Sequence, residues 1–361
     1  MPRTYERPRS RDTRMFAMTV PGLAGLTART LGDLDGVSAA EQGFDGRSDV
    51  VLLDVGRAAR SELVDTRLAE DVFVELGRTT RSDGDSARRI AGRLWGEEAA
   101  TRALSIWAEQ RGPLRAGMSF RVIVRVLQET SFLRTDLRRE MIAAIGQQRP
   151  KWKFADPSEL EVWVSEYLPG RFVAGLRLSD ERMRQHGGRI AQRQGALRPT
   201  VAAALVDLAG GPDGLLLDPC CGSGTILAEA LDAGWAVRGL DIDPAAVAVA
   251  RDNIPRDGAA PAGVEITVGD VRRLPLGDAT VGASVSNLPF GRQFTMAGDP
   301  QAWLRQALAE LARVTRPGGR VILLAPNLPG PVVPRELRRT DRFPIKLLGT
   351  PTSVWVFARV A

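Results

Sequence analysis

The chain has 361 residues, more than one average domain needs, so the length alone predicts two or three domains. Hydrophobic residues make up 44% and charged residues 25%, and no apolar run approaches the ~18 residues of a spanning helix. This composition excludes a fibrous, a wholly disordered or a membrane-spanning protein. The formal charge is +6, carried almost entirely by arginine, the side chain best shaped to bind phosphate. No hydrophobic signal segment opens the sequence, and we expect a cytoplasmic protein.

The first 105 residues predict a basic tail and a small α+β unit. Residues 1–14 hold five arginines and two prolines with few apolar residues, so we expect them to be disordered. Within 15–105, apolar alternation and turn signals define the elements. They are a strand within 15–23 that ends in a Pro-Gly turn, a helix at 24–31, a strand at 48–55 and a helix followed by a turn at 73–80.

Residues 106–180 predict a second α+β unit, in which strict alternation of polar and apolar residues marks the first strand. The later strands are separated by a Pro-Gly turn, which is typical of a hairpin. The elements expected are a strand at 119–127, a helix at 136–148 with Thr135 as its N-cap, and a hairpin of strands at 160–167 and 171–178.

The polar stretch 181–195, with a Gly-Gly pair and several arginines, is predicted to be a linker. From residue 196 strands alternate with helices, which indicates a parallel sheet covered on both faces. The last two strands have no helix between them, so they should form an antiparallel hairpin at one edge. The expected helices are 197–209, 224–234, 244–253 and 300–319, and the expected strands are 214–220, 236–243, 264–270, 281–291, 320–326, 343–349 and 353–360.

A glycine-rich turn follows the first strand of this sheet, in the sequence LLLDPCCGSGT at 215–225. Gly222 and Gly224 allow a positive φ and a close approach of a ligand to the backbone, and the helix that follows presents free N–H groups. A dinucleotide site would have G-x-G-x-x-G and a phosphate loop would have G-K-[ST], and neither is present. Asp218 before the turn instead suits a cationic ligand, such as the amine of an amino acid.

Two further acids end the next two strands. Asp241 closes the second strand, 19 residues after Gly222, where a carboxylate grips the two hydroxyls of a ribose. Asp270 closes the third strand, where it is placed to accept a hydrogen bond from an adenine amine. Any one of these acids alone is as well explained as a helix cap. Three acids at successive strand ends, however, fit one adenosyl ligand with an amino-acid tail, namely S-adenosylmethionine.

The fourth strand ends in the sequence SNLPFG at 286–291. The side-chain oxygen of Asn287 and the carbonyl of Leu288 can accept the two N–H bonds of an exocyclic base amine, which localises the lone pair of the nitrogen for attack on a methyl sulfonium. Pro289 fixes the turn, and Phe290 can stack on the base. The base must be unstacked to reach this pocket. No basic residue is required, which suits a chain with one histidine.

The motifs DPCCGSGT, GLDID, TVGD and NLPFG resemble those of the Asn-Pro-Pro-Tyr class of S-adenosylmethionine-dependent amino-methyltransferases. Within that class, the stretches FAMTVPGLAGL and GALRPTVAAAL resemble the THUMP-domain RNA guanine-N2 methyltransferases, and residues 119–180 are similar to a THUMP domain. The resemblance covers residues 15–361. In that family the THUMP domain docks the tRNA acceptor end with its single-stranded 3′ terminus, and the catalytic domain methylates guanine N2 in the acceptor-stem region.

The resemblance implies an α/β protein with a C-terminal Rossmann-like methyltransferase sheet and N-terminal ferredoxin-like and THUMP α+β domains. The boundaries expected are a ferredoxin-like domain at 15–105, a THUMP RNA-binding domain at 106–180 and, after the linker 181–195, a methyltransferase domain at 196–361. The function expected is that of a tRNA (guanine-N2)-methyltransferase.

The site residues follow from the motifs and the resemblance together. The catalytic residues expected are Asn287, Leu288, Pro289 and Phe290, and no metal is expected. The sequence departs from the family pattern because Asn-Leu-Pro-Phe replaces Asn-Pro-Pro-Tyr: Leu288 keeps the carbonyl, while Phe290 keeps the stacking face and loses the hydroxyl. The residues expected to bind the cofactor are Thr200, Asp218, Cys220, Gly222, Gly224, Thr225, Asp241, Ile242, Asp270, Val271 and Asn287.

Three other residues could take part in function. Cys221 lies in the cofactor loop and is expected to pack structurally rather than to act as a nucleophile. His186, the only histidine, lies in the polar linker, where we expect it to be solvated or in contact with RNA. Trp152 lies between two lysines, and it belongs either to the core or to an RNA-binding surface.

The positive charge is unevenly distributed along the chain. Residues 106–195 carry 16 cations against 10 anions, whereas 196–361 carry 17 against 16; the tail 1–14 carries 5 against 2, and 15–105 carry 11 against 15. We therefore expect tRNA to be bound by residues 106–195, with the basic tail as a further candidate. No membrane partner is expected, and we expect a monomer.

Three alternatives stay open at this point. The substrate could be a hairpin of 23S rRNA in place of tRNA. The acceptor could be a protein glutamine amide, since enzymes of that kind also use an Asn-Pro-Pro-Tyr turn. The protein could also be an RNA-binding protein with an inactive catalytic domain, although the complete set of cofactor motifs argues against this.

Overall fold

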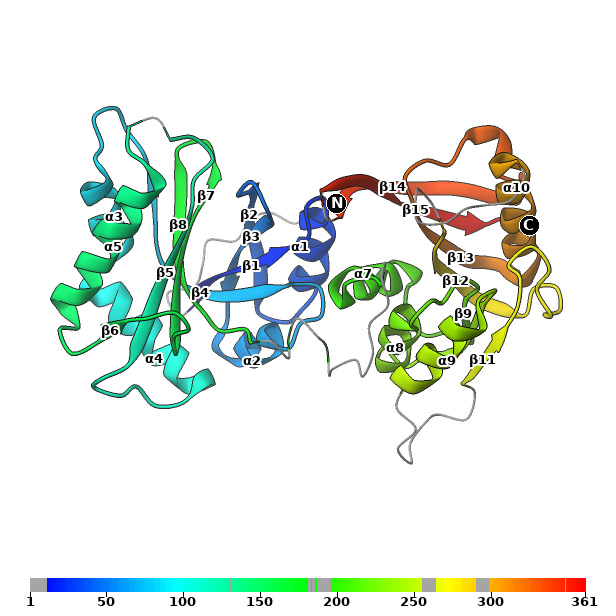
Figure 1. Cartoon of the computed structure of the whole chain (residues 1–361), viewed down its shortest axis with the longest axis horizontal. Coiled ribbons are helices and arrows are strands. Elements are labelled where there is room, and N and C mark those ends of the chain that lie inside the picture. Colours follow the sequence, from blue (N-terminus) through cyan, green and yellow to red (C-terminus); the bar gives the residue numbers. More distant parts are fainter. Residues whose placement is uncertain are drawn as a thin grey trace. The chain divides into compact units, whose positions relative to one another are not determined.

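The computed structural model describes residues 12–129, 131–180, 183, 186, 196–254, 264–289, 299–347 and 349–361. The chain divides into two compact units, Met1–Arg184 and Gln185–Ala361, which run from blue to green and from green to red in Figure 1. The boundary falls inside the predicted linker 181–195, most of which lies outside the described residues, as does most of the predicted tail. No helix within the described part of the chain is long and apolar enough to cross a membrane.

The first unit is built on one mixed sheet, with strand order β2-β3-β1-β4-β8-β7-β5-β6. Most neighbouring strands are antiparallel, but β5 runs parallel to both β6 and β7. The strands are β1 (Thr13–Thr19), β2 (Val37–Phe44), β3 (Asp49–Val55), β4 (Asp71–Thr80), β5 (Ser119–Arg125), β6 (Lys153–Phe154), β7 (Leu160–Leu168) and β8 (Arg171–Arg177). The predicted hairpin of β7 and β8 is confirmed by their antiparallel pairing.

This sheet is continuous across residue 105, where the sequence suggested a domain boundary. The join is the antiparallel pair of β4 and β8, in which Phe73 lies opposite Arg177 and Thr80 lies opposite Arg171. The strands of 15–105 and 106–180 therefore share one set of backbone hydrogen bonds. The assignment of these two stretches to separate ferredoxin-like and THUMP domains stays a prediction.

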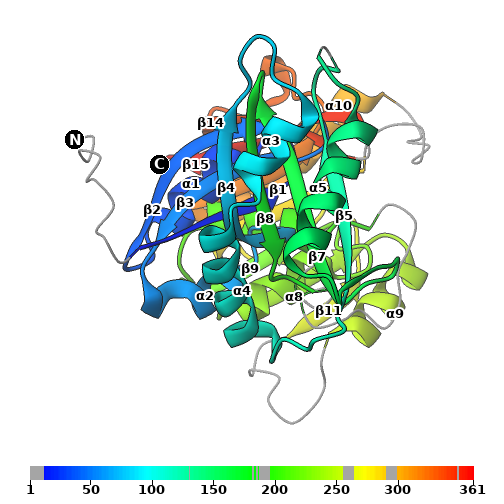
Figure 2. The same ribbon diagram turned by 90° about the vertical axis from the view of Figure 1, so that its left-hand side faces the viewer.

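Helices cover one face of this sheet, and Figures 1 and 2 show α3, α4 and α5 together on that face. Their apolar side chains, among them Ile90, Leu104 and Leu137, form one core with the strands. The helices of the unit are α1 (Ala24–Gly32), α2 (Arg60–Val64), α3 (Ala87–Leu94), α4 (Glu97–Arg111) and α5 (Arg134–Gln148), with a 3-10 turn at Arg57–Ala59.

The opposite face of the sheet is closed by its own curvature. A second core lies there, with Phe16 stacked on Phe73 at 4.5 Å and Trp163 beside them. The sheet bends so far that β2 contacts β7, although the two strands are not neighbours in the sheet. Gly43 makes this approach possible, because a Cβ there would lie 2.2 Å from the carbonyl oxygen of Tyr167.

The segment 73–80, predicted as a helix followed by a turn, is instead part of the strand β4, so that prediction is wrong. β4 lies in the middle of the sheet, and Phe73 and Val74 are both fully buried, one on each face. A short apolar run of this kind does not distinguish a buried strand from a helix, and burial decided the outcome. Gly77 allows the end of α3 to approach, since a Cβ would meet the carbonyl of Arg93 at 3.0 Å.

The helix predicted at 136–148 is confirmed as α5, but its expected N-cap is wrong. The helix begins at Arg134 after Leu133, so Thr135 lies inside its first turn. The carboxylate of Asp136 accepts a hydrogen bond of 3.1 Å from the backbone N–H of Leu133. The acid in the first turn therefore supplies the capping contact that the sequence assigned to the threonine.

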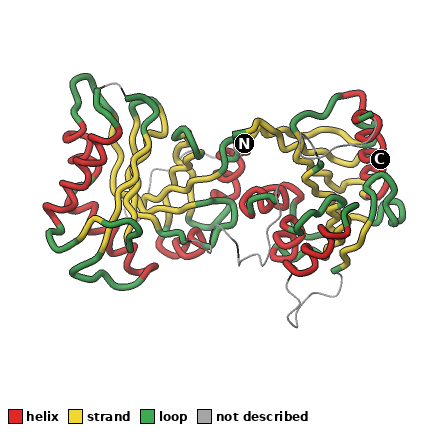
Figure 3. Tube along the Cα trace, in the orientation of Figure 1, coloured by secondary structure: helices red, strands yellow, loops and turns green. Residues whose placement is uncertain are grey.

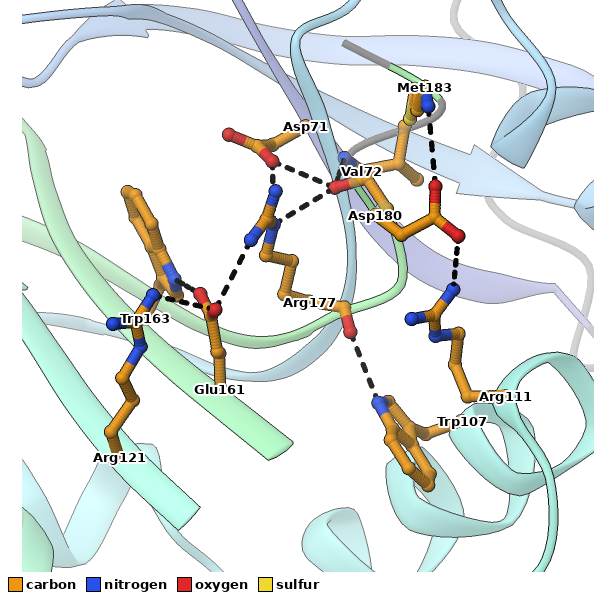
Figure 4. Close-up of polar contacts among 11 residues, drawn as sticks. Asp71, Val72, Trp107, Arg111, Arg121, Glu161, Trp163, Arg177, Asp180 and Met183 are labelled. Carbon is orange, nitrogen blue, oxygen red and sulfur yellow. Dashed lines mark hydrogen bonds and ion pairs between the residues drawn. The ribbon is translucent and has the colours of Figure 1, made fainter. Parts of the chain in front are cut away.

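A polar network ties four strands of this unit together (Figure 4). Arg177 on β8 donates from Nε to Asp71 at 2.7 Å and from Nη1 to Glu161 at 3.2 Å, and Arg121 donates to Glu161 at 2.7 Å. Burial raises the pKa of Glu161, but a hydrogen bond from Trp163 and the two arginines outweigh it, so the net pKa is lowered. The network therefore holds an ionised carboxylate between β5, β7 and β8 and links them to β4.

The second unit is the parallel sheet that the sequence predicts, with strand order β11-β10-β9-β12-β13-β15-β14. The strands up to β13 are parallel, whereas β15 is antiparallel to both β13 and β14. The predicted terminal hairpin at one edge is thus confirmed. The strands are β9 (Leu215–Asp218), β10 (Ala236–Asp241), β11 (Glu265–Val268), β12 (Val281–Asn287), β13 (Thr315–Ala325), β14 (Leu337–Leu347) and β15 (Thr350–Arg359).

Helices flank this sheet on both sides, and Figure 3 shows α10 on one side of the strands and α7, α8 and α9 on the other. They are α7 (Pro199–Ala209), α8 (Thr225–Asp232), α9 (Pro244–Asn253) and α10 (Pro300–Val314), with a 3-10 turn at Gly330–Val332. The helix predicted at 300–319 is too long by five residues. Pro317 cannot continue a helix, and Gly318 has φ +82°, so residues 315–319 are not helical. Position 319 requires glycine, because a Cβ there would lie 2.5 Å from the carbonyl oxygen of Gly282.

Candidate active site

The predicted site residues gather at the carboxyl edge of the parallel sheet. Asp218 is the last residue of β9, Asp241 of β10 and Asn287 of β12, and Asp270 follows β11 by two residues. The chain runs outward from β9 to β10 and β11 in one direction and from β12 to β13 in the other. This edge is therefore the topological switch point, where ligands bind in sheets of this kind.

The glycine-rich loop after β9 is fastened to the end of β10. The N–H of Gly222 donates to Oδ2 of Asp241 at 2.8 Å, and the N–H of Cys221 donates to the carbonyl of Leu240 at 2.8 Å. Gly222 has φ +53° and Gly224 has φ +81°, both in the left-handed region. A Cβ at Gly224 would also lie 3.2 Å from that of Ala250, so the loop is shaped for glycine.

Asp218 lies beneath this loop and is 1% exposed. Its Oδ1 accepts hydrogen bonds from the hydroxyl of Ser286 at 2.8 Å and from the N–H of Cys220 at 3.2 Å. Burial raises the pKa of Asp218 to about 7, and the negative charge of Asp241 adds to the rise while the two hydrogen bonds oppose it. A positively charged ligand group would restore the ionised form, so the carboxyl is suited to a cation.

The start of α8 carries a buried hydroxyl without a partner. Oγ1 of Thr225, the first residue of the helix, is enclosed and makes no hydrogen bond with any residue that the structure describes, beside the free N–H groups of the helix end. Thr200 in the first turn of α7 is also buried. An orphaned hydroxyl at a helix N-terminus suits an anionic ligand group, such as a carboxylate.

Ile242 follows Asp241 and is 68% exposed, the highest exposure among the large hydrophobic side chains described. Val271, by contrast, lies in the core with Leu274, so only its backbone can meet a ligand. Together with Asp241, Ile242 offers an apolar surface beside a carboxylate, which suits a planar ring joined to a sugar.

Asp270 is already engaged by a neighbour. Arg272 donates from Nε at 3.0 Å and from Nη2 at 2.6 Å to the same carboxylate, and this hydrogen bonding lowers the pKa of Asp270. If Asp270 also accepts a hydrogen bond from an adenine amine, as expected, its carboxylate must serve both that amine and Arg272. The two carboxylate oxygens have about four acceptor positions in total, so both donors can be accommodated.

The strand end at Asn287 supplies the other half of the site. Asn287 is half-buried, and its carboxamide forms no hydrogen bond with any described residue. The N–H of Leu288 donates to the carbonyl of Leu324 at 3.3 Å, and its side chain is buried in the core, which fixes the turn. Pro289 follows, while Phe290 lies outside the described residues. The amide oxygen of Asn287 is thus left available to an amine.

Residues 186–332 match the model of the UPF0020 family, described as RMKL-like, methyltransferase domain. The match covers less than half of the chain and shows what this segment is similar to.

Several proteins to which the chain is similar act on RNA according to their names. The U6 snRNA (guanine-N(2))-methyltransferase THUMPD2 of Mus musculus is 36% identical over 131 residues, 36% of this chain and 24% of that protein. The tRNA (guanine(6)-N(2))-methyltransferase THUMP3 of Bos taurus is 30% identical over 231 residues, 57% of this chain and 44% of that protein. The chain thus spans less than half the length of these relatives.

The whole fold has a counterpart among solved structures. TrmN from Thermus thermophilus superposes with a TM-score of 0.74 at 24% identity, covering 96% of this chain and all of that one. A likeness at this identity establishes the fold, which is α/β with a Rossmann-like methyltransferase sheet.

The two cysteines of the methyltransferase domain are poor nucleophiles. Burial and the charges of Asp218 and Asp241 raise the pKa of both thiols, so the thiolate is disfavoured. Cys221 packs beneath β10, where a Cβ on Gly239 would lie 3.3 Å from its sulfur. This environment agrees with the packing role expected for Cys221.

His186 is buried, so the prediction of a solvated or RNA-contacting histidine is wrong. Its side chain is 3% exposed, and Nδ1 lies 2.9 Å from Oε1 of Glu229, which α8 carries. The sequence could not show this contact, because it depends on a buried acid 43 residues further along the chain.

Proposed function

We propose that the protein is an S-adenosylmethionine-dependent RNA methyltransferase that methylates the N2 amine of a guanosine in the acceptor-stem region of tRNA. The observation that carries the proposal is the carboxamide of Asn287, which bonds to none of the described residues, at a strand end next to the Asp218 loop. The names of the relatives, which are guanine-N2 methyltransferases of tRNA and U6 snRNA, support the choice of amine.

The residues of the cofactor pocket fit the groups of S-adenosylmethionine. Asp218 pairs with the ammonium group, Thr225 and the α8 N–H groups receive the carboxylate, and Asp241 binds the ribose hydroxyls. The adenine ring lies on Ile242. Thr200, Cys220, Gly222, Gly224, Asp270 and the backbone of Val271 complete the pocket. When bound, the cofactor supplies an electrophilic methyl group on a sulfonium.

Asn287 and Leu288 prepare the nucleophile. The guanine N2 lone pair is delocalised into the ring, so the amine is weakly nucleophilic. The Asn287 side-chain oxygen and the Leu288 carbonyl accept its two N–H bonds, which turns the lone pair toward the methyl group. Pro289 holds the turn, and Phe290 stacks on the unstacked base. Catalysis then depends on positioning rather than on a basic side chain.

RNA binding is assigned to residues 106–195, with the basic tail as a further contributor. Exposed aromatic residues beside cations support this: Phe154 is 45% exposed with the Arg138 guanidinium 5.3 Å from its ring centre. Trp152 is half-buried against Phe120, and Arg149 lies 5.8 Å from the centre of its ring. A cytoplasmic, monomeric enzyme is part of the same proposal.

The proposal is tested by incubating the full chain and S-adenosylmethionine with separate substrates: unmodified tRNA, 23S rRNA fragments, U6 snRNA and glutamine-containing peptides. Methylation of tRNA at guanine N2 is the expected result. Methylation of peptide glutamine alone would replace the RNA acceptor with a protein, and transfer to rRNA or U6 snRNA alone would change the RNA substrate.

A further inference from the structure

We propose that Arg339 and Arg342, which lie over Trp355 on the terminal hairpin, form a phosphate-binding site for the RNA backbone next to the target nucleotide. The proposal rests on the proposed function and extends RNA contact into the methyltransferase domain. The guanidinium carbon of Arg342 lies 4.5 Å from the Trp355 ring centre, and that of Arg339 lies 5.7 Å from it. One indole is therefore in contact with two cations.

A β-bulge brings the two arginines to one face of the sheet. Side chains three residues apart on a regular strand face opposite sides. Here the pairing of β14 with β15 shifts just after Arg339, where Thr340 is the additional residue, and its hydroxyl donates to the β15 backbone at 3.3 Å. Arg339 consequently lies opposite Phe357 and Arg342 opposite Trp355, two β15 residues that share a face.

The pair of guanidiniums has no carboxylate to neutralise it. Both arginines are exposed, and neither makes an ion pair with any residue that the structure describes. Arg342 only donates from Nε to the Ser353 hydroxyl at 3.1 Å. The acid of the strand, Asp341, pairs with Val356 and so faces the other side. Two adjacent, unpaired guanidiniums repel each other in the free protein and match the oxygens of a phosphate.

The Trp355 platform is rigid. Its ring is 3% exposed, and Nε1 donates to the carbonyl of Ala325, the last residue of β13, at 2.9 Å. A buried ring held by this hydrogen bond fixes the position of the stacked cations, so less side-chain entropy is lost when they bind a ligand.

Arg342 lies in a row of paired residues that crosses the sheet to Ser286, the residue before Asn287. Ser286, which precedes Asn287, pairs with Leu323, Leu323 with Trp355, and Trp355 with Arg342. Three strand spacings separate the two ends of this row, or about 14 Å. A short stretch of RNA backbone spans that distance, so a nucleotide bound at Asn287 would place a nearby phosphate at Arg339 and Arg342.

The test compares Arg339→Gln and Arg342→Gln with Arg338→Gln, a matched control. Arg338 is exposed on the same strand and adjacent to Arg339, but it pairs with Ala358 and faces the other side. For each full-length variant, KM and kcat for unmodified tRNA are measured across a series of salt concentrations, together with thermal stability and cofactor affinity.

Each test variant should raise the tRNA KM about 3- to 10-fold and reduce the salt slope of binding by about 1, with kcat and cofactor affinity unchanged. Arg338→Gln should change KM by less than about 2-fold. If the test variants only lower the melting temperature, with KM and slope like those of Arg338→Gln, the arginines serve the hairpin alone and the proposal is overturned.

Failure of the proposed function looks different. In that case the wild-type chain methylates no RNA, whatever the arginine variants do. Binding of tRNA to the same variants, measured by filter retention, then decides the phosphate site separately: weaker binding confined to Arg339→Gln and Arg342→Gln supports it, and equal binding by all three variants contradicts it.

Discussion

Ser286 donates a hydrogen bond of 2.8 Å from its hydroxyl to Oδ1 of Asp218, and both side chains are buried. Asp218 ends the strand that leads into the cofactor loop, and Ser286 immediately precedes Asn287. This bond therefore joins the pocket proposed for the cofactor to the turn proposed for the target amine. The distance between methyl donor and acceptor depends on the relative position of these two strand ends.

The raised pKa of Asp218 predicts that cofactor affinity depends on pH. With a pKa of about 7, the empty site is largely protonated below pH 7, whereas the ammonium group of the cofactor binds the ionised carboxylate. Affinity should therefore be constant well above pH 7 and fall about tenfold per pH unit below it. Calorimetric titrations at pH 6 and pH 8 measure this, with proton release on binding expected near pH 6.

Asp218→Asn is the control for this prediction. The amide keeps the size of the side chain but cannot ionise, so affinity should be low at both pH values and nearly independent of pH. A wild-type protein whose affinity is equal at pH 6 and pH 8 would show that Asp218 does not pair with the ligand cation.

Replacing Asn287 with alanine should abolish methyl transfer while sparing the cofactor. The carboxamide makes no hydrogen bond with the described residues, so its removal leaves no buried group unpaired and stability should change little. We expect a loss of about 100-fold or more in kcat, similar to the removal of one transition-state hydrogen bond. Asn253→Ala is a suitable control for the loss of a carboxamide side chain. The Asn253 amide donates to the Ser223 carbonyl and so supports the structure of the loop, whereas Asn287 is proposed to bind the target amine.

Gly224→Ala should weaken both folding and cofactor binding. The residue has φ +81°, and the added Cβ would lie 3.2 Å from that of Ala250. Strain of this kind costs about 1–3 kcal/mol, and relief would shift the N–H groups at the start of α8. Chemical denaturation and cofactor titration measure the two effects. Gly211→Ala, where a Cβ meets nothing within 4 Å, should leave both unchanged.

Arg177→Met should destabilise the first unit strongly. The arginine pairs with Asp71 and Glu161, all three being largely buried, so its loss removes one cation from both carboxylates, and Glu161 keeps Arg121. Breaking a buried pair in this way costs about 3–5 kcal/mol. Arg111→Met removes the more exposed pair with Asp180 and should cost less than about 1 kcal/mol. Equal costs for the two variants would mean that the ion pairs of Arg177, drawn in Figure 4, contribute little to the free energy of unfolding.

The sequence predicted the methyltransferase domain well because its signals are local. The strands β9 to β12 are short, and they end at or just before Asp218, Asp241, Asp270 and Asn287, so these residues could be assigned to one sheet edge. Parallel topology then brings such residues together without further information. The end of α10 was misplaced, because Gly319 is required by a contact with Gly282, a residue distant in the sequence.

The first unit was harder to predict because its structure depends on long-range contacts. β4 is a strand because β1 and β8 pair with its two edges and an apolar core lies on each of its faces, which its own residues do not reveal. The curvature of the sheet depends on the contact of Gly43 with Tyr167.

Two features of the second unit were missed for a similar reason. The burial of His186 depends on its contact with Glu229. The stacking of two arginines on Trp355 depends on a β-bulge, which changes the face on which side chains lie and leaves no signal in charge counts.

We propose that the site directs a guanine N2 amine toward the methyl group of the cofactor. The most direct test is mass spectrometry of nucleosides from unmodified tRNA incubated with the full chain and methyl-labelled S-adenosylmethionine, with Asn287→Ala as the blank. We expect labelled N2-methylguanosine with the wild type and none with the variant. Label in another nucleoside, or equal labelling by the variant, would contradict it.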